Sequence, residues 1–279
     1  MIGKRDLIRI KENSSKLFEI SKQIKILRYL AWDKSVRTSF LNSKYETIPK
    51  IEYPKFDSEE LRANLKKLKF LNGDTPYDKW LEEKTNDILS SIDLLQLSGT
   101  KRFLKKSEQI YGSPNFVLRD GKTSTLNLAK KFENLIDSHL EHFSESLQVD
   151  PIPVSNVKKK IEERVQPIFG SKSPKIIIEN QLSARATASS KRIRLRRGAS
   201  FTNKDVDQLI NHEAFIHVAT TLNGRHQTNV KILGAKTGSI TKTQEGLAVF
   251  SEFITGCIDV NRMYRISDRV IAIQMAIDG

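Results

Sequence analysis

The hydrophobic pattern of the chain changes near residue 171, and this change constrains the fold most. Before it, apolar side chains recur at helical spacing, in windows at about 76–98, 101–111, 124–147 and 155–168. After it, the β-branched run Lys175–Glu179 predicts a buried strand, and Arg192–Arg196 alternates charged and apolar side chains like a half-exposed strand. We therefore predict an α+β fold, with a mostly helical region over residues 1–170 and a small sheet with further helices over residues 171–279.

Composition narrows the classes of function that are open to the chain. Its single cysteine rules out an intrachain disulfide and a cysteine-only metal cluster. No apolar run approaches the length of about 18 residues that a membrane helix needs, and the start of the sequence has no apolar signal core, so we expect a cytoplasmic protein. Lysine and arginine number 47 against 33 aspartates and glutamates, which gives a formal net charge of +14. This balance favours an acidic peptide or another polyanion as partner.

The most informative segment for chemistry places two histidines around a glutamate. It belongs to a predicted helix, which begins with a capping box formed by Thr202 and Asp205. Neutral imidazole is a common zinc ligand, and a glutamate after the first histidine can deprotonate water. His212 and His217 are five residues apart, and five residues rotate a regular helix by about 140°, so their rings would diverge. For both to bind one metal ion, the helix must widen, so we predict a π-bulge or a break between them; the alternative is two helix histidines, one buried and one solvated.

A third metal ligand is offered by Glu245, which lies 28 positions after His217. The sequence predicts that it stands in the first turn of an apolar helix that begins near Thr241 and is buried on most sides. A carboxylate in such a place has to be paired, protonated or bound to a metal. The alternatives are that Glu245 caps the helix, and that Glu252, seven residues further on, is the ligand instead.

Several motifs, taken in order, resemble one family of proteins. They are residues 182–186 (LSARA), 194–198 (RLRRG), the histidine segment 211–217 (NHEAFIH), 221–225 (TLNGR) and 244–248 (QEGLA). This series resembles the bacterial flavohemoglobin expression-modulating proteins that are named for their QEGLA motif. Those proteins are relatives of the eukaryotic microtubule-associated tyrosine carboxypeptidase, a zinc metallopeptidase. The resemblance covers about residues 175–279.

The resemblance implies a zincin-like metallopeptidase core over residues 171–279, with Zn²⁺ as cofactor. His212 and His217 match the two histidine ligands, Glu245 matches the third ligand, and Glu213 matches the catalytic glutamate. The implied reaction is carboxypeptidase-like hydrolysis of a peptide bond, since the eukaryotic relatives remove a carboxy-terminal tyrosine from tubulin. Members of the family continue beyond the position of Gly279, so the core is expected to be truncated at its carboxy end.

Arginines are the candidates for binding the carboxylate of a substrate, because a guanidinium group can hold a carboxylate with two hydrogen bonds. Arg185 and Arg225 lie in family-like motifs and are the two candidates. Residues 191–197 carry five positive charges in seven positions. They predict either a solvated edge strand, or a strand that lines the cleft beside the histidine helix and favours acidic peptides. A nucleic-acid patch is the third interpretation, although no aromatic residues accompany the run.

Two hypotheses of function follow from these observations. The first is a zinc-dependent, carboxypeptidase-like enzyme that acts on the carboxy terminus of a peptide or protein. The alternative is a non-enzymatic basic regulator or nucleic-acid-binding adaptor in which the metal motif is a relic. Metal content discriminates between them, because only the first hypothesis requires a bound zinc ion.

Overall fold

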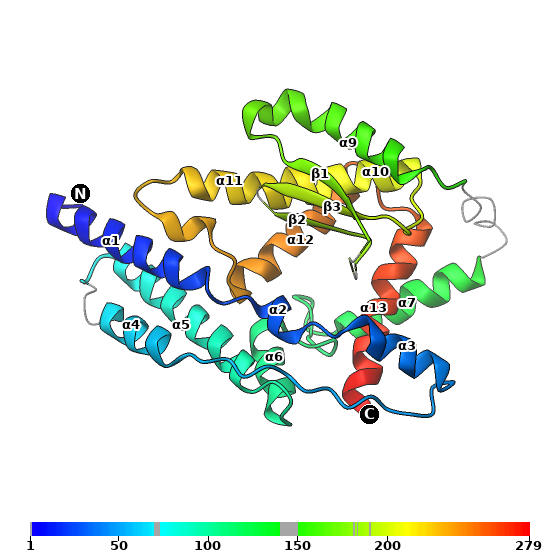
Figure 1. Cartoon of the computed structure of the whole chain (residues 1–279), viewed down its shortest axis with the longest axis horizontal. Coiled ribbons are helices and arrows are strands. Elements are labelled where there is room, and N and C mark those ends of the chain that lie inside the picture. The colour runs from blue at the N-terminus through cyan, green and yellow to red at the C-terminus, as the bar shows by residue number, and fades with distance from the viewer. Residues whose placement is uncertain (1, 70–72, 140–149, 181, 183, 190) are drawn as a thin grey trace. The chain divides into compact units, whose positions relative to one another are not determined.

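The computed structural model of the chain describes residues 2–69, 73–139, 150–180, 182, 184–189 and 191–279 (Figure 1). It confirms the α+β class, because a small three-stranded sheet accompanies many helices. Of the predicted helical window 124–147, residues 140–147 lie outside the described residues. Among the helices that are described, none combines the length and the apolar character that crossing a membrane requires.

The chain forms two compact units. The first consists of Met1–Tyr111 and Gly224–Thr241, and the second of Gly112–Asn223 and Lys242–Gly279. The boundary that the sequence suggests near residue 170 falls inside the second unit. The physical reason is that the helix before this position and the strand after it bury their apolar side chains in one core.

The first unit is helical. Its elements are α1 (Lys4–Ser21), α2 (Ile26–Leu30), α3 (Lys34–Asn42), α4 (Glu59–Lys69), α5 (Pro76–Gln96), α6 (Arg102–Tyr111) and the 3-10 helix η3 (Lys231–Gly234). Helix α1 packs against α4, α5 and η3 and buries Ile10 and Leu17, which lie on one face because seven residues make about two helical turns. On the same face, the hydroxyl oxygen of Ser14 accepts a hydrogen bond of 3.0 Å from the backbone N–H of Ile232.

Helix α5 begins with a capping box that is joined to α1. The hydroxyl of Thr75 accepts a hydrogen bond of 3.2 Å from the N–H of Asp78, whose carboxylate accepts one of 3.1 Å from the N–H of Thr75. Arg9 donates to both oxygens of this buried carboxylate, over 3.1 and 2.7 Å. Burial alone would raise the pKa of Asp78, but the hydrogen bonds from Arg9 and Thr75 hold it well below its usual range.

Replacing Asp78 with Asn is expected to lower the free energy of unfolding at pH 7 by about 1–3 kcal/mol, because a buried charged acceptor is lost. Folding lowers the pKa of Asp78, so its stabilisation is complete above the unfolded-state pKa of about 3.9 and declines as the pH falls below that value. Urea unfolding should therefore show a smaller difference between wild type and variant at pH 3 than at pH 7. The exposed Asp74 provides the control, Asp74→Asn. An equal difference at both pH values would contradict the assignment.

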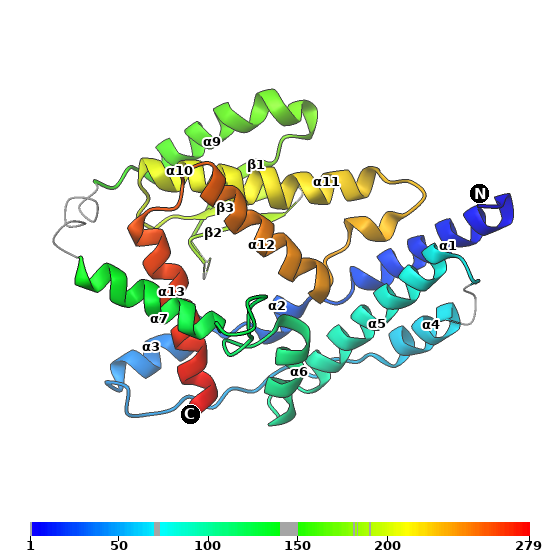
Figure 2. The ribbon, with the colours of Figure 1, turned by 180° about the vertical axis from the view of Figure 1, so that it is seen from behind.

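The second unit combines the sheet with further helices. They are α7 (Thr125–Ser138), α9 (Val154–Phe169), η1 (Gly170–Lys172), β1 (Lys175–Glu179), β2 (Ala186–Ser189), β3 (Arg192–Arg196), α10 (Asn203–Leu209), η2 (Ile210–Val218) and α13 (Val260–Asp278). Helices α11 (Ala219–His226) and α12 (Gly238–Ile254) each contribute to both units. Figure 2 shows α13 crossing α7, and the two helices are in contact.

The basic strand β3 is the centre of the sheet. The strand order is β1-β3-β2, with β1 parallel and β2 antiparallel to β3. The edge-strand interpretation of this run is therefore wrong. Its apolar residues, Ile193 and Leu195, are fully buried in the same core as Val157 and Ile161 of α9, and this burial holds the strand in the middle despite its charges.

Strand β2 is the edge of the sheet that packs against the helix η2. Its residues Ala186–Ser189 are small and carry no β-branched run, so the sequence pattern does not predict it. Two arginines of the basic run interact with the end of β1. Nη1 of Arg194 lies 3.7 Å from Oε2 of Glu179, the last residue of β1. Nε of Arg197 donates to Oδ1 of Asn180, the residue after β1, over 2.8 Å. Strand β2 contacts the histidine helix, and the apolar residues of β3 share a buried core with that helix; the prediction that the basic strand lines a cleft there stays a prediction.

Candidate metal centre

One uninterrupted helical stretch carries both histidines, running from α10 through η2 into α11. It begins with the predicted capping box, in which Thr202 accepts from the N–H of Asp205 over 3.1 Å and Asp205 accepts from the N–H of Thr202 over 2.8 Å. Residues Ile210–Val218 form a π-helix. The π-bulge predicted from the five-residue spacing is therefore confirmed.

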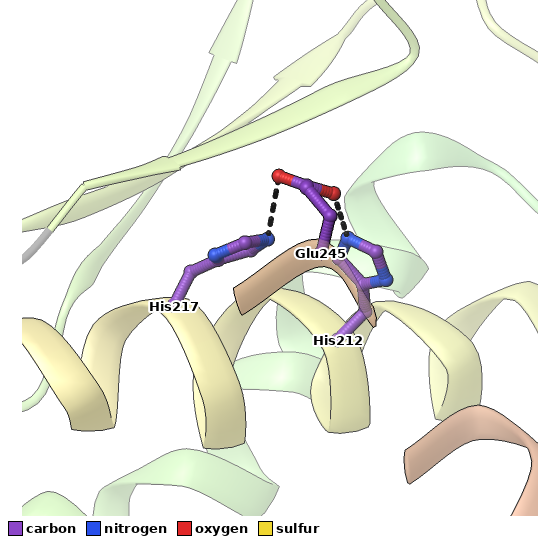
Figure 3. Close-up of side chains that lie close together, drawn as sticks. All are labelled: His212, His217 and Glu245. Carbon is purple, nitrogen blue, oxygen red and sulfur yellow. Dashed lines mark ion pairs between the residues drawn. The ribbon is translucent and has the colours of Figure 1, made fainter. Parts of the chain in front are cut away.

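The wider turn brings the two imidazoles together. Their ring centroids are 4.9 Å apart and the rings are inclined by 64°. Figure 3 shows both rings on the same side of the helix. Each histidine is 8% exposed, so both side chains are buried. The alternative of one buried and one solvated histidine is wrong, because both side chains are buried and their rings are neighbours.

Glu245 of helix α12 completes the group (Figure 3). Its carboxylate oxygens lie 3.6 Å from Nε2 of His212 and 3.4 Å from Nε2 of His217. One potential ligand atom from each of the three residues lies within 4.8 Å of the others. Residues far apart in the sequence therefore present two imidazole nitrogens and a carboxylate to one point.

The position of Glu245 within its helix differs from the prediction. Helix α12 begins at Gly238 rather than near Thr241, so Glu245 lies two turns inside and the capping alternative is wrong. Its side chain is 55% exposed, whereas the sequence predicts burial. The expectation that most sides of α12 are buried is also wrong, because Phe250, Phe253 and Ile254 are 55%, 68% and 62% exposed.

The residues around Glu245 fix α12 against the histidine helix. Gln244 donates to the hydroxyl oxygen of Thr220 over 2.8 Å. Ala248, one turn after Gln244, is fully buried. Its small side chain allows the helix to pack closely at this point. The QEGLA segment thus has a structural explanation. Gln244 binds the histidine helix, Glu245 presents its carboxylate to the histidines, and the small Ala248 allows the helix to pack closely.

Glu252 has a different function from the ligand role that the sequence left open. It is fully buried, and its Oε1 lies 2.6 Å from Nδ1 of His212, on the side of the ring away from Glu245. Gln208 donates to Oε1 over 3.1 Å, and Arg262 donates to both oxygens over 2.8 Å. Burial would raise the pKa of Glu252, but His212 and Arg262 lower it to about 2. Glu252 is therefore an ionised partner of a candidate ligand rather than a ligand itself.

The charges around His212 favour a cation at the centre. Burial would lower the pKa of His212, but the hydrogen bonds with Glu245 and Glu252 and the charge of Glu213 raise it to about 9. Glu213 follows His212 directly, is half-buried, and acts on that ring electrostatically. Carboxylates that hold a proton on an imidazole also stabilise a divalent cation that takes the proton's place. The donor set, two imidazoles and one carboxylate, fits zinc.

Of the two arginines proposed for the substrate carboxylate, Arg185 is bound by an aspartate, and the role of Arg225 stays a prediction. Arg185 binds Asp205 with both terminal nitrogens, over 3.1 and 2.8 Å, and lies 5.0 Å over the ring of Phe201. Its guanidinium group thus supports the start of the histidine helix. Arg225 belongs to the first unit, where a Cβ atom on Gly234 would come within 2.8 Å of its Cγ. The described partners of Arg185 are thus Asp205, the backbone oxygen of Ser200 and the ring of Phe201, and none of them is a candidate ligand.

Two histidines from one helix and a glutamate from a later helix are the ligand set of peptidases with a catalytic zinc. The three side chains could therefore hold a metal ion of this kind. The chain belongs to the microtubule-associated tyrosine carboxypeptidase family, whose model matches residues 38–279. No curated protein and no solved structure gives a significant match. The match confirms the predicted relation to the tyrosine carboxypeptidase, while the affiliation with the QEGLA-motif proteins stays a prediction.

Proposed function

We propose that this protein is a zinc-dependent peptidase of the carboxypeptidase type. The observation that carries the proposal is the convergence of His212, His217 and Glu245, which the π-helix makes possible. Membership in a carboxypeptidase family supports the same reaction class. Zinc in this position would polarise the carbonyl of the scissile peptide bond and lower the pKa of water at its open coordination position.

The side chains divide the remaining work. His212, His217 and Glu245 would hold the metal ion. Glu213 would take a proton from the attacking water and deliver it to the amine that leaves, because its carboxylate follows a ligand histidine and its charge already acts on that ring. The neighbouring carboxylate of Glu252 would keep His212 oriented.

The proposed substrate is the carboxy terminus of a peptide or protein, with a preference for acidic sequences. The family name supports a carboxy-terminal site of cleavage, and the net charge of +14 supports the preference. Strand β2 is the sheet edge in contact with the histidine helix, and an extended peptide can pair with such an edge. A cytoplasmic location remains part of the proposal.

The purified protein is expected to contain about one zinc ion per chain and to release the last residue of an acidic test peptide. Elemental analysis measures the first quantity, and mass spectrometry of the peptide the second. A chelator should remove both the metal and the activity, and added zinc should restore both. Protein without zinc that also fails to take up added zinc would contradict the proposal.

The alternative, a basic regulator that binds nucleic acid, makes the opposite prediction. The net charge of +14 is the observation that favours it. Binding to a nucleic acid would then weaken steeply with salt, because counterions are released from the phosphates. Salt-sensitive binding to RNA or DNA by a metal-free protein would support the regulator, whereas zinc binding and peptide cleavage would support the peptidase.

A further inference from the structure

A buried carboxylate connects the candidate metal centre to helix α13. Glu252 accepts hydrogen bonds from Gln208 of α10 and from Nε and Nη2 of Arg262 of α13, and its Oε1 contacts His212 of η2. Arg262 is 8% exposed and Glu252 is fully buried, so water competes little for these contacts. Three helical elements therefore meet at one side chain that is not itself a candidate ligand.

The arrangement of donors determines what Glu252 does to His212. The amide of Gln208 and the guanidinium of Arg262 can only donate to it, so the carboxylate is surrounded as an acceptor. Nδ1 of His212 then acts as donor in the 2.6 Å contact. The hydrogen on Nδ1 leaves the other nitrogen, Nε2, as the atom for a metal ion, and Nε2 is the atom that faces Glu245.

The guanidinium of Arg262 holds Glu252 in this orientation. It binds the two carboxylate oxygens with one nitrogen each, both over 2.8 Å, which fixes the plane of the carboxylate. Arg262 is itself placed by the start of α13, where Asp259 accepts a hydrogen bond of 2.8 Å from its backbone N–H. Helix α13 in turn packs along α7.

We infer that Arg262 is a positioning residue for the metal centre, and that it acts through Glu252 to fix the orientation and tautomer of His212. The affinity for the metal ion then depends on the placement of helix α13, although α13 provides no ligand. This inference rests on the proposed zinc-binding function. It adds to the site a residue on a helix that carries none of the candidate ligands.

The variant Arg262→Met removes both hydrogen bonds to Glu252 and keeps most of the side-chain volume. Its affinity for Zn²⁺, measured by competition with a fluorescent chelator, is expected to fall about 10–100-fold, the range found when outer partners of ligand histidines are changed. The ¹⁵N spectrum of the imidazoles should also change, because His212 loses its fixed Nδ1–H. Arg269→Met changes an exposed arginine of the same helix and is expected to alter neither quantity.

A second variant covers the case in which Arg262→Met does not fold. Arg262→Lys keeps the positive charge but cannot bind both oxygens in one plane. Its affinity for Zn²⁺ should therefore be lower than that of the wild type and higher than that of Arg262→Met. The Arg269→Met control should bind Zn²⁺ like the wild type. Wild-type protein that binds no zinc would overturn the proposed function. Zinc binding by the wild type, with unchanged affinity and unchanged ¹⁵N spectrum in folded Arg262→Lys, would overturn the positioning role alone.

Discussion

Replacing Glu213 with Gln is expected to lower kcat/KM for peptide hydrolysis by about 10²–10⁴-fold while zinc stays bound. The substitution keeps the shape and the polarity of the side chain but removes its ability to take up a proton. Glu213 is the proposed proton acceptor, because it directly follows His212 on the π-helix and its charge raises the pKa of that ring. Initial rates on an acidic peptide and elemental analysis of the same preparation measure the two quantities together.

The control for this experiment is Glu163→Gln, which changes an exposed glutamate on helix α9. It should leave both the rate and the zinc content unchanged. The assignment of Glu213 as proton shuttle would be contradicted by a variant that keeps the full rate. It would equally be contradicted by Glu213→Gln losing zinc as completely as a His217→Ala variant, because Glu213 would then be a ligand.

The geometry of the histidine pair could be predicted because it follows from the spacing once both residues are taken as ligands of one metal ion. Two ligands five residues apart on a regular helix diverge by about 140°, and only a wider turn brings them together. The strands β1 and β3 were predictable for the same kind of reason, since a β-branched run and an alternating run are local patterns. Local periodicity thus gives the ligand-bearing helix and the two main strands.

The orienting network around His212 could not be predicted, because its members are joined only by tertiary packing. Glu252 lies 40 residues from His212 and 10 from Arg262, and no sequence periodicity links these positions. The seven-residue step from Glu245 to Glu252 indicates a shared helical face, and the sequence therefore suggested that either could be the ligand. Only the structure places one carboxylate at Nε2 and the other at Nδ1 of the same ring.

Burial of helix α12 was mispredicted for a related reason. Its run of apolar residues is typical of a buried helix, yet Leu247 and Phe250 are 44% and 55% exposed. What burial there is concentrates on the face that carries Ala248 and Glu252, which are both fully buried. The sequence shows how apolar a helix is, but which of its faces is buried depends on the elements that pack against it.

Replacing Glu245 with Ala is expected to abolish tight zinc binding and to leave the stability of the metal-free protein nearly unchanged. The loss of affinity should exceed the roughly 10–100-fold change that follows from altering an outer partner, because one of three candidate ligands is removed. The side chain of Glu245 is 55% exposed, so little packing is lost. The sequence pattern alone, which places this residue at the start of a buried helix, predicts a destabilised fold instead.

Glu252→Ala provides the comparison, because the two glutamates differ in position but not in chemistry. Removing Glu252 leaves the buried Arg262 without its partner, and breaking a buried ion pair in this way typically costs about 3–5 kcal/mol of stability. We therefore expect Glu252→Ala to unfold at lower temperature than Glu245→Ala, and to retain weakened zinc binding where it is folded. Thermal unfolding of the metal-free variants and zinc titration below the melting range separate these effects. If Glu245→Ala kept zinc at wild-type affinity while folded Glu252→Ala lost it, the two carboxylates would have to exchange roles.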